Sequence, residues 1–291
     1  MPSPILAATD FSPLADFAVE RAARLARERQ WPLHLLHVYN EFAWSNLRKL
    51  LREPSGHDAE AAARERLRSL ASELETRHGL PDVGSTLLSG RASVGIATQA
   101  RELAAGLVVL GAHGEGIVRE LALGGTAIKV LRSSSCPVLV VRREPKQAYA
   151  RILTGTDFSA TSARALRTAI EGFPGASHAV INAYSVAFEG RMRATGSSEE
   201  DIERYREEDR EVAQRNMDAF VADANYQAAG GVQTCVRHGY SAAILLDEAQ
   251  RRDSDLLVVG KHGISVLDEK LLGSVTLNVM HHAFCDVLLV P

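Results

Sequence analysis

Short apolar runs alternate along the chain with longer stretches in which apolar residues recur at helical spacing. In the first half the runs are too short to be helices, so they predict strands. The expected strands are residues 5–8, 33–38, 83–88, 107–111 and 137–141. The expected helices are residues 13–25, 58–78, 92–104 and 126–132, the first of them begun by Ser12 and Pro13.

The second half of the chain repeats this order. Its expected strands are residues 152–155, 178–184, 232–237, 256–260 and 287–290. Its expected helices are residues 160–171, 199–222 and 241–251, with a last helix opened by Gly273. Apolar strands that alternate with helices predict a parallel sheet covered on both faces, and the right-handed crossover rule makes each sheet doubly wound. The fold class is therefore α/β, and ligands of such sheets bind beyond the carboxyl ends of the strands.

The two halves are duplicated domains. Residues 5–12 read ILAATDFS and residues 152–159 read ILTGTDFS, so Asp10 corresponds to Asp157 (157 − 10 = 147). Later in each half a constant displacement relates Gly111 to Gly260 (260 − 111 = 149). The segment 142–150 is charged and contains Pro145, as expected of a linker. We therefore expect two domains, residues 1–146 and 147–291.

Composition narrows the class of protein. The chain has 291 residues with 33 Lys and Arg against 36 Asp and Glu, a net charge of −3, which argues against a nucleic-acid binder. Three widely spaced cysteines favour thiols of a reducing compartment over a disulfide framework. The N-terminus does not read as a signal peptide, and no apolar run is long enough for a membrane span. We expect a cytoplasmic protein.

Glycines follow the fourth expected strand of each half. In domain 2 they form the pattern Gly260-x-x-Gly263, nine residues, then Gly273-Ser274-Val275. Glycine permits positive φ and a close approach of backbone to ligand, and a helix N-terminus offers N–H groups to an anion. Two such turns facing one crevice predict a polyphosphate cradle. The pattern is neither a Walker A motif nor the dinucleotide GxGxxG.

These motifs resemble the universal stress protein family. The resemblance rests on the ILAATDFS opening, the G-x-x-G-x9-G-[ST] pattern and a closing strand written CPVLVV, and it covers the whole chain as a tandem member. It implies a five-stranded parallel sheet in each domain, ordered 3-2-1-4-5, with an adenine nucleotide in the crevice. It also implies that strands 138–142 and 287–290 pair in an intramolecular pseudo-dimer, with a homodimer of such chains as a further expectation.

The resemblance implies a set of nucleotide-binding residues in domain 2. Thr156 and Asp157 would flank adenosine, Ala183 would contact adenine, and the glycine loops would hold phosphates. The set is Thr156, Asp157, Ala183, Gly260, Lys261, His262, Gly263, Ile264, Ser265, Gly273, Ser274 and Val275. Two alternatives stay open: Lys261 pairs with a phosphate or points to solvent, and His262, like His113, contacts the ligand or caps its turn. The ligand is ATP, ADP or AMP, and its phosphates rather than protein side chains would hold Mg²⁺ or Mn²⁺.

Domain 1 departs from the pattern at one position. Its corresponding residues are Thr9, Asp10, Val38, Gly111, His113, Gly114, Gly124, Gly125 and Thr126. Gly125 stands where Ser or Thr is expected, and Thr126 follows one position late. A lost hydrogen bond to a phosphate costs about 1.5–3 kcal/mol, or about tenfold to a hundredfold in affinity. We therefore expect weaker binding in domain 1. The family's aspartate before the fourth strand is present as Asp255 and replaced by Gly106.

Other candidate chemistry is sparse. His34 and His37 lie three apart on a strand and point to opposite faces, so no metal site is expected there, and adjacent His281 and His282 fail in the same way. We find no catalytic motif, so at most weak ATP hydrolysis is expected. The segments 39–57 and 186–198 differ between the halves, which fits either a partner-facing region or a freely varying loop.

The function expected from the sequence is that of a nucleotide-dependent stress-response module that binds ATP through its glycine loops and acts on an unidentified protein partner. One alternative is a scaffold that binds a protein or an apolar ligand without nucleotide. The other is a slow ATPase or nucleotidyl transferase in the same crevice.

Overall fold

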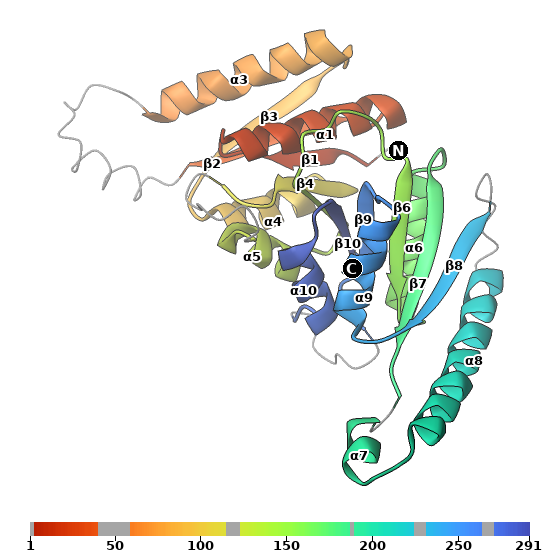
Figure 1. Ribbon diagram of the computed structural model, residues 1–291. Helices are drawn as coiled ribbons and strands as arrows, with labels where there is room; N and C mark the ends of the chain where they lie inside the picture. The colour runs from red at the N-terminus through yellow and green to blue at the C-terminus, as the bar shows by residue number, and fades with distance from the viewer. Residues whose placement is uncertain (1–2, 40–58, 115–122, 187–188, 224–230, 264–270) are drawn as a thin grey trace. The chain divides into compact units, whose positions relative to one another are not determined.

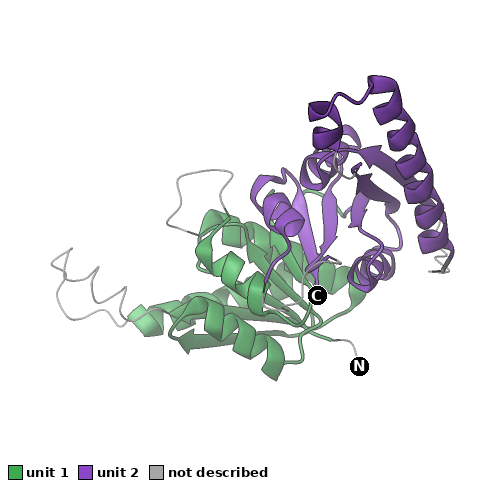
Figure 2. Ribbon diagram, turned by 90° about the horizontal axis from the view of Figure 1, so that it is seen from below, with its two compact units in different colours: residues 1–148 green, residues 149–291 purple. Residues whose placement is uncertain are grey.

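The computed structural model describes residues 3–39, 59–114, 123–186, 189–223, 231–263 and 271–291. The chain divides into two compact units, residues 1–148 and 149–291, coloured separately in Figure 2. We call them domain 1 and domain 2 and describe each by itself. Over the described residues no helix combines the length and the apolar character that crossing a bilayer requires.

Domain 1 is a five-stranded parallel sheet in the order β3-β2-β1-β4-β5. The strands are β1 (Ile5–Ala8), β2 (Leu33–Tyr39), β3 (Val83–Ser89), β4 (Leu107–Gly111) and β5 (Val138–Val141). The helices are α1 (Pro13–Arg29), α3 (Ala59–His78), α4 (Ala92–Glu102) and α5 (Gly125–Ser133). Helices α1 and α3 pack together on one face of the sheet, and α4 and α5 pack together on the other (Figure 1).

Domain 2 repeats the arrangement in the order β8-β7-β6-β9-β10. The strands are β6 (Arg151–Thr156), β7 (Ser177–Tyr184), β8 (Val232–His238), β9 (Leu256–Gly260) and β10 (Asp286–Val290). The helices are α6 (Ala160–Gly172), α7 (Glu189–Ala194), α8 (Glu199–Asp223), α9 (Ser241–Arg251) and α10 (Ser274–His282). The expected order 3-2-1-4-5 is confirmed in both domains. Helix α7 was not expected, because its six residues are too few to show helical periodicity.

The central strands are mostly apolar because helices cover both faces of each sheet. In β1 and β5 every residue is buried, and Leu6 and Leu139 are 0% exposed. The helix after each first strand begins at a serine: Ser12 Oγ accepts from Ala15 N at 3.3 Å, and Ser159 Oγ accepts from Ser162 N at 3.2 Å. These caps fix where the chain turns back from the carboxyl edge of the sheet.

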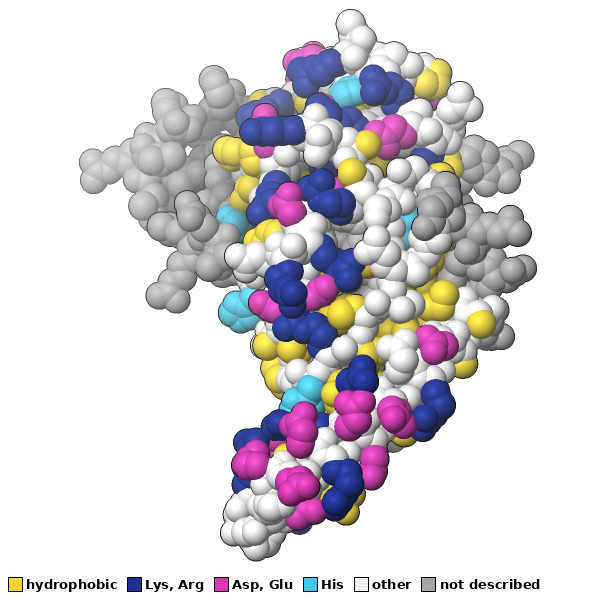
Figure 3. All heavy atoms as spheres, turned by 45° about the vertical axis from the view of Figure 1, so that its right-hand side comes forward, with side chains coloured by type: hydrophobic (Ala, Val, Ile, Leu, Met, Phe, Trp, Pro, Cys, Tyr) yellow, Lys and Arg dark blue, Asp and Glu magenta, His cyan; other side chains and the backbone are white. Residues whose placement is uncertain are grey.

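The long helices present a charged face to solvent. Helix α8 buries Ile202 and Met217, both 0% exposed, and Met217 packs in one cluster with Val180 of β7. Its outer face carries ion pairs one turn apart, such as Arg204–Asp201 at 2.7 Å and Arg210–Glu207 at 2.6 Å. Figure 3 shows acidic and basic side chains interleaved over this helix. Exposed pairs of this kind contribute little to stability, so burial of the inner face holds α8 in place.

Asp255 acts at the opposite edge of domain 2, the amino ends of the strands. Its Oδ2 accepts from the backbone N–H groups of Ala150 at 2.9 Å and Arg151 at 2.8 Å. In domain 1 the corresponding Gly106 has no side chain to accept these bonds. The backbone bond is shared, since Gly106 N donates to Pro4 O at 3.0 Å and Asp255 N donates to Arg151 O at 2.9 Å. The difference at this position therefore concerns how the first strand is fastened and does not touch the carboxyl edge where ligands bind.

Candidate functional site

Each sheet carries a cavity at the carboxyl ends of its middle strands. The domain 1 cavity has a volume of about 320 Å³ and lies where β1 and β4 end. The domain 2 cavity has a volume of about 310 Å³ and lies where β6 and β9 end. Both lie at the switch point of a doubly wound sheet, where the strand order reverses and ligands of this fold class bind.

The T-D-F-S turn after the first strand forms one wall of each cavity. In domain 2, Thr156 Oγ1 accepts from Phe158 N at 2.9 Å, and Asp157 Oδ1 accepts from Ser159 N at 3.1 Å. Phe158 has φ 65°, an uncommon conformation for a bulky residue. Such strain persists only where surrounding contacts enforce it, and here the threonine and aspartate side chains hold the turn.

Domain 1 builds the same turn with the same bonds. Thr9 Oγ1 accepts from Phe11 N at 2.9 Å, Asp10 Oδ1 accepts from Ser12 N at 3.1 Å, and Phe11 has φ 63°. The same geometry occurs in both domains, so the turn holds its aspartate in the same position at the wall of each cavity.

The glycine after the fourth strand is required by that aspartate. A Cβ built on Gly263 would lie 2.6 Å from Asp157 Oδ2, and one built on Gly114 would collide with Asp10 Oδ2. A Cβ on Gly260 would lie 2.9 Å from Thr161 Cγ2. Of the two properties that glycine permits, positive φ is not used here, since Gly114, Gly260 and Gly263 all lack it. The glycines allow close packing of loop against turn instead.

Two helix N-termini open into the cavities. In domain 2, Gly273 N donates to Lys261 O at 3.1 Å, and the first helical bond runs from Leu277 N to Gly273 O at 2.9 Å. Gly273 itself supplies no side-chain cap. The N–H groups of Ser274 through Thr276, which line the cavity, therefore lie in the first turn, where a helix has no acceptor of its own. Together with the helix dipole they form an anion-binding end.

Helix α5 of domain 1 is fastened in the same way. Gly124 N donates to Ala112 O at 2.8 Å, and Ile128 N donates to Gly124 O at 3.1 Å. Gly125, Thr126 and Ala127 line the cavity. The backbone part of the anion-binding end is therefore present in both domains.

The second strand of each domain ends beside the cavity. In domain 1, Leu36 O accepts from Thr9 N at 2.9 Å, so the backbone of Leu36 faces β1. Successive residues of a strand direct their backbone groups to alternate neighbours, so Val38 faces the same side, where β1 has already ended. Val38 and its counterpart Ala183 both line their cavities. Each can offer a backbone donor and acceptor to the edge of a planar ring.

The residues expected from the sequence converge on these cavities. All nine in domain 1 line the cavity: Thr9, Asp10, Val38, Gly111, His113, Gly114, Gly124, Gly125 and Thr126. In domain 2 the lining includes Thr156, Asp157, Ala183, Gly260, His262, Gly263, Gly273, Ser274 and Val275. Ile264 and Ser265 lie outside the described residues.

Lys261 is placed differently from both of its expected positions. It is 6% exposed, so it does not point to solvent, and it does not line the cavity. Its backbone N–H donates to Val290 O at 2.7 Å, which places it on the sheet side of the loop. In the described part of the chain neither cavity is lined by a Lys or Arg side chain.

Domain 2 adds polar residues that the sequence reasoning missed. Asn182 Nδ2 donates to Thr156 O at 2.9 Å, Thr156 Oγ1 and Ser162 Oγ lie 2.9 Å apart, and Thr276 Oγ1 donates to Gly260 O at 2.8 Å. Ser241 lines the cavity as well. Aligning the two halves position by position would have found them, because three of the four stand opposite alanine in domain 1.

The recurring histidines His113 and His262 line the cavities. Within the described residues, the Nδ1 atom of each is buried and has no hydrogen-bond partner. These nitrogens therefore do not cap the turn, which was one of the two alternatives. His34 and His37 of β2 contact different neighbours. His34 Nε2 lies 2.7 Å from Thr86 Oγ1, and His37 Nδ1 lies 2.8 Å from Thr9 O.

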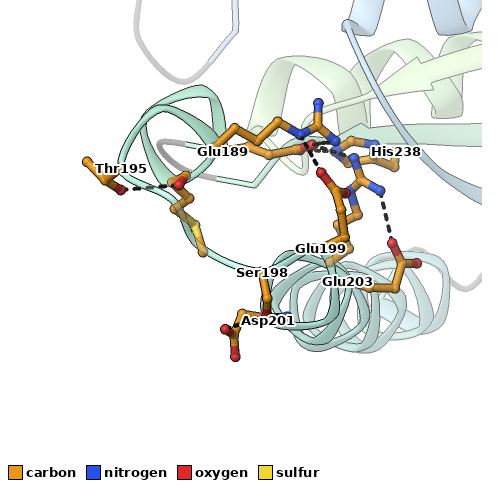
Figure 4. A network of polar contacts seen from close by, with 10 residues as sticks. Glu189, Thr195, Ser198, Glu199, Asp201, Glu203 and His238 are labelled. Atoms are coloured by element: carbon orange, nitrogen blue, oxygen red, sulfur yellow. Dashed lines mark hydrogen bonds and ion pairs between the residues drawn. The ribbon is translucent and has the colours of Figure 1, made fainter.

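A polar network lies at the carboxyl ends of β7 and β8 in domain 2 (Figure 4). Glu189 on α7 accepts from Arg206 on α8, pairs with Arg193 at 3.2 Å and pairs with His238 at 3.0 Å. The hydrogen bond from Arg206 holds the pKa of Glu189 below its ordinary value. The network fastens α7 to the sheet within segment 186–198, where the two halves diverge.

The cysteines show no sign of activation. Cys285 is buried, while Cys136 and Cys235 are half-buried. Burial raises the pKa of both the Cys136 and the Cys235 thiols. A raised pKa lowers the thiolate fraction and therefore the reactivity of each group.

Comparison with known proteins gives the family. The sequence model of the universal stress protein family matches residues 1–142 and again residues 148–291. Universal stress protein YxiE of Bacillus subtilis (strain 168) is 31% identical over 145 residues, which is 47% of this chain and 97% of YxiE. Universal stress protein Mb2019 of Mycobacterium bovis is 29% identical over 185 residues, 57% of each chain.

Solved structures share the fold over both domains. A universal stress protein from Archaeoglobus fulgidus superimposes with a TM-score of 0.70 at 18% identity, covering 99% of this chain and 98% of the other. One from Pseudomonas aeruginosa UCBPP-PA14 gives 0.67 at 22% identity, covering 99% and 92%. At these identities the likeness concerns the fold alone. With the family match in each half, the chain belongs to the universal stress protein family as a tandem, two-domain member.

Proposed function

We propose that domain 2 binds ATP at the carboxyl edge of its sheet and that the chain acts as a nucleotide-dependent regulatory module of the stress response. One observation carries this proposal. A single cavity of about 310 Å³ joins an aspartate turn, two close-packed glycine positions and the N-terminus of α10. An adenine nucleotide needs these three things: contacts for base and ribose, room for the backbone to approach, and N–H donors for phosphate.

We assign each part of the nucleotide to one region of the cavity lining. The adenine would lie at the end of β7 against Ala183, and Asp157 would face the ribose. The phosphates would lie over Gly263 and the first turn of α10, where Ser274 adds a hydroxyl. The side chains of Asn182 and Ser162 hold the Thr156 turn in position beneath the nucleoside.

The charge of the phosphates needs a counterion. In the described lining neither cavity has a Lys or Arg side chain, so the helix dipole and backbone N–H groups provide the positive potential. Among the described residues no cluster of His, Cys, Asp or Glu is arranged to hold a metal ion. We infer that Mg²⁺ or Mn²⁺ would enter bound to the phosphates, which supply its hard oxygen ligands.

Nucleotide would act as a signal rather than a substrate. Binding would order the glycine loops around the phosphates, and a cytoplasmic partner protein would read the altered surface. The competing candidates are a slow ATPase and a scaffold without nucleotide.

Mass analysis of what the purified protein releases on gentle denaturation tests the proposal. We expect adenine nucleotide, or stoichiometric uptake of Mg-ATP when the protein is isolated empty. Gly263→Ala should abolish uptake because the new Cβ meets the Asp157 carboxylate. Gly175→Ala is the matched control, because a Cβ there meets nothing within 4 Å. Absence of both nucleotide and uptake would favour the scaffold, and steady release of ADP lost in Gly263→Ala would favour the ATPase.

A further inference from the structure

We propose that the domain 1 cavity binds a purine nucleoside with at most one phosphate and selects against the triphosphate. The two cavities would then take different ligands. The inference rests on the proposed function to the extent that the nucleoside end of the domain 2 site is repeated in domain 1.

The nucleoside end is the part that the two domains share. Thr9 and Asp10 repeat the turn of Thr156 and Asp157 with hydrogen bonds that differ by no more than 0.1 Å, and Val38 lies where Ala183 lies. The cavity volumes, about 320 and about 310 Å³, are nearly equal. A ligand recognised by this end fits either domain.

The phosphate end is where they differ. Two hydroxyl side chains in the first turn of α10 correspond to residues without a side-chain donor in the first turn of α5. Ser274 and Thr276 become Gly125 and Ala127. Domain 1 has one hydroxyl there, that of Thr126 in place of Val275, together with the N–H groups of the first turn. That set suits one phosphate and leaves a longer chain with fewer donors.

Two apolar side chains in the wall of the domain 1 cavity are larger than their counterparts in domain 2. Val38 replaces Ala183, and Leu110 replaces Val259. Ile96 faces them from α4, where domain 2 has Leu245. Larger apolar contacts favour a planar base and ribose, whose recognition does not depend on charge.

Electrostatics around the turn favour a low-charge ligand as well. Asp16 on α1 stands where α6 has Ala163. Burial raises the pKa of Asp16, Arg66 opposes this, and the charge of Asp10 raises the pKa as well. The negative charge of Asp10 therefore acts on Asp16. A polyphosphate beside Asp10 would add to this negative charge, whereas a nucleoside would not.

Titration calorimetry on single-site variants of the full chain tests the proposal. Gly263→Ala closes the domain 2 site and leaves domain 1 to be measured with Mg-ATP, AMP and adenosine. We expect one AMP or adenosine per chain, bound at least tenfold more tightly than ATP. Equal or tighter binding of ATP, or no binding of any of the three, overturns the proposal.

The matched variant Gly114→Ala closes domain 1 and tests the proposed function separately. ATP binding that persists in Gly114→Ala while Gly263→Ala binds nothing would sustain the domain 2 site and refute the domain 1 ligand. The reverse pattern would refute the domain 2 site alone.

A gain-of-function variant covers the case in which a glycine variant fails to fold. Gly125→Ser with Ala127→Thr, made in the Gly263→Ala background and again in the otherwise unaltered chain, restores the two α5 hydroxyls. A Cβ at Gly125 meets nothing within 4 Å, so the serine fits. We expect domain 1 to bind ATP about tenfold more tightly and adenosine within threefold of its former affinity. An unchanged ATP affinity would contradict the assigned role of the missing hydroxyls.

Discussion

The two cavities of this protein share what the backbone provides and differ in what side chains provide. Both have the strained phenylalanine turn, the close-packed glycine and an uncapped helix N-terminus. Only domain 2 lines the cavity with Ser162, Ser274 and Thr276. The turn and the helix N-terminus consist of backbone whose position depends on the whole fold, whereas a hydroxyl is lost by one substitution. After duplication, ligand preference can therefore diverge while the architecture stays fixed.

The largest effect should come from making domain 2 resemble domain 1. Ser274→Gly with Thr276→Ala removes a phosphate donor and the bond from Thr276 Oγ1 to Gly260 O. We expect ATP affinity to fall about tenfold to a hundredfold, equivalent to about 1.5–3 kcal/mol, as measured by calorimetry. Adenosine affinity is the internal control and should hardly change. An equal loss of adenosine affinity would show that these hydroxyls contact the nucleoside and not the phosphates.

The side chain of Asp255 stabilises the amino edge of the domain 2 sheet, and domain 1 has no counterpart of this side chain. Asp255→Ala leaves the N–H groups of Ala150 and Arg151 without their carboxylate, so domain 2 should lose about 1–3 kcal/mol of unfolding free energy. Asp253→Asn is the matched control, because it removes only the exposed ion pair with Arg151 at 2.9 Å, and asparagine tolerates the φ of 49° at this position. Chemical denaturation measures both, and ATP affinity should be unaffected. Equal destabilisation by the control would contradict the assignment.

The glycines at the ends of the third strands test backbone strain in each domain. Gly90 has φ +128° and Gly239 has φ +141°, so alanine at either position is strained by about 1 kcal/mol or more. A Cβ at Gly239 would also approach Ile244 Cδ1 at 3.0 Å, while one at Gly90 meets nothing within 4 Å. We expect Gly239→Ala to lower the denaturation midpoint more than Gly90→Ala. A larger decrease for Gly90→Ala would mean that the Ile244 side chain moves away from the new Cβ without lowering the free energy of unfolding.

The smallest effect concerns acid stability. Burial lowers the pKa of His178, which is 1% exposed and stands in β7 where β2 has Leu33. A histidine with a lowered folded pKa contributes stability above the unfolded value of 6.5 and loses it as pH falls below that value toward the folded pKa.

His178→Leu should therefore flatten the loss of domain 2 stability between about pH 7 and pH 5, by about 1 kcal/mol or less. Denaturation at the two pH values measures it. The same treatment of His34, whose pKa burial also lowers, should flatten the loss in domain 1. A His178→Leu chain that is as acid-sensitive as the unaltered protein would show that other titrating groups carry the effect.

Much of the fold follows from local pattern. Apolar runs too short for helices, serine caps such as Ser12 and Ser159, and a constant displacement between halves predict the described elements to within a few residues. These signals are local, because each is carried by neighbours in sequence. Helix α7 was not predicted because its six residues are too few to show helical periodicity. Its position depends on the contacts of Glu189 with Arg206 and His238.

The sequence by itself determined the duplication, the α/β class and the residues that gather at the carboxyl edge. Only the tertiary structure decided why the glycines are needed, since contact with Asp157 is invisible from φ preferences. It also decided that Lys261 is buried and that Asn182 and Ser162 support the turn. The physical reason is common to these cases. Spacing along the chain gives residue type and periodicity, whereas burial and hydrogen bonding depend on which strands the sheet brings together.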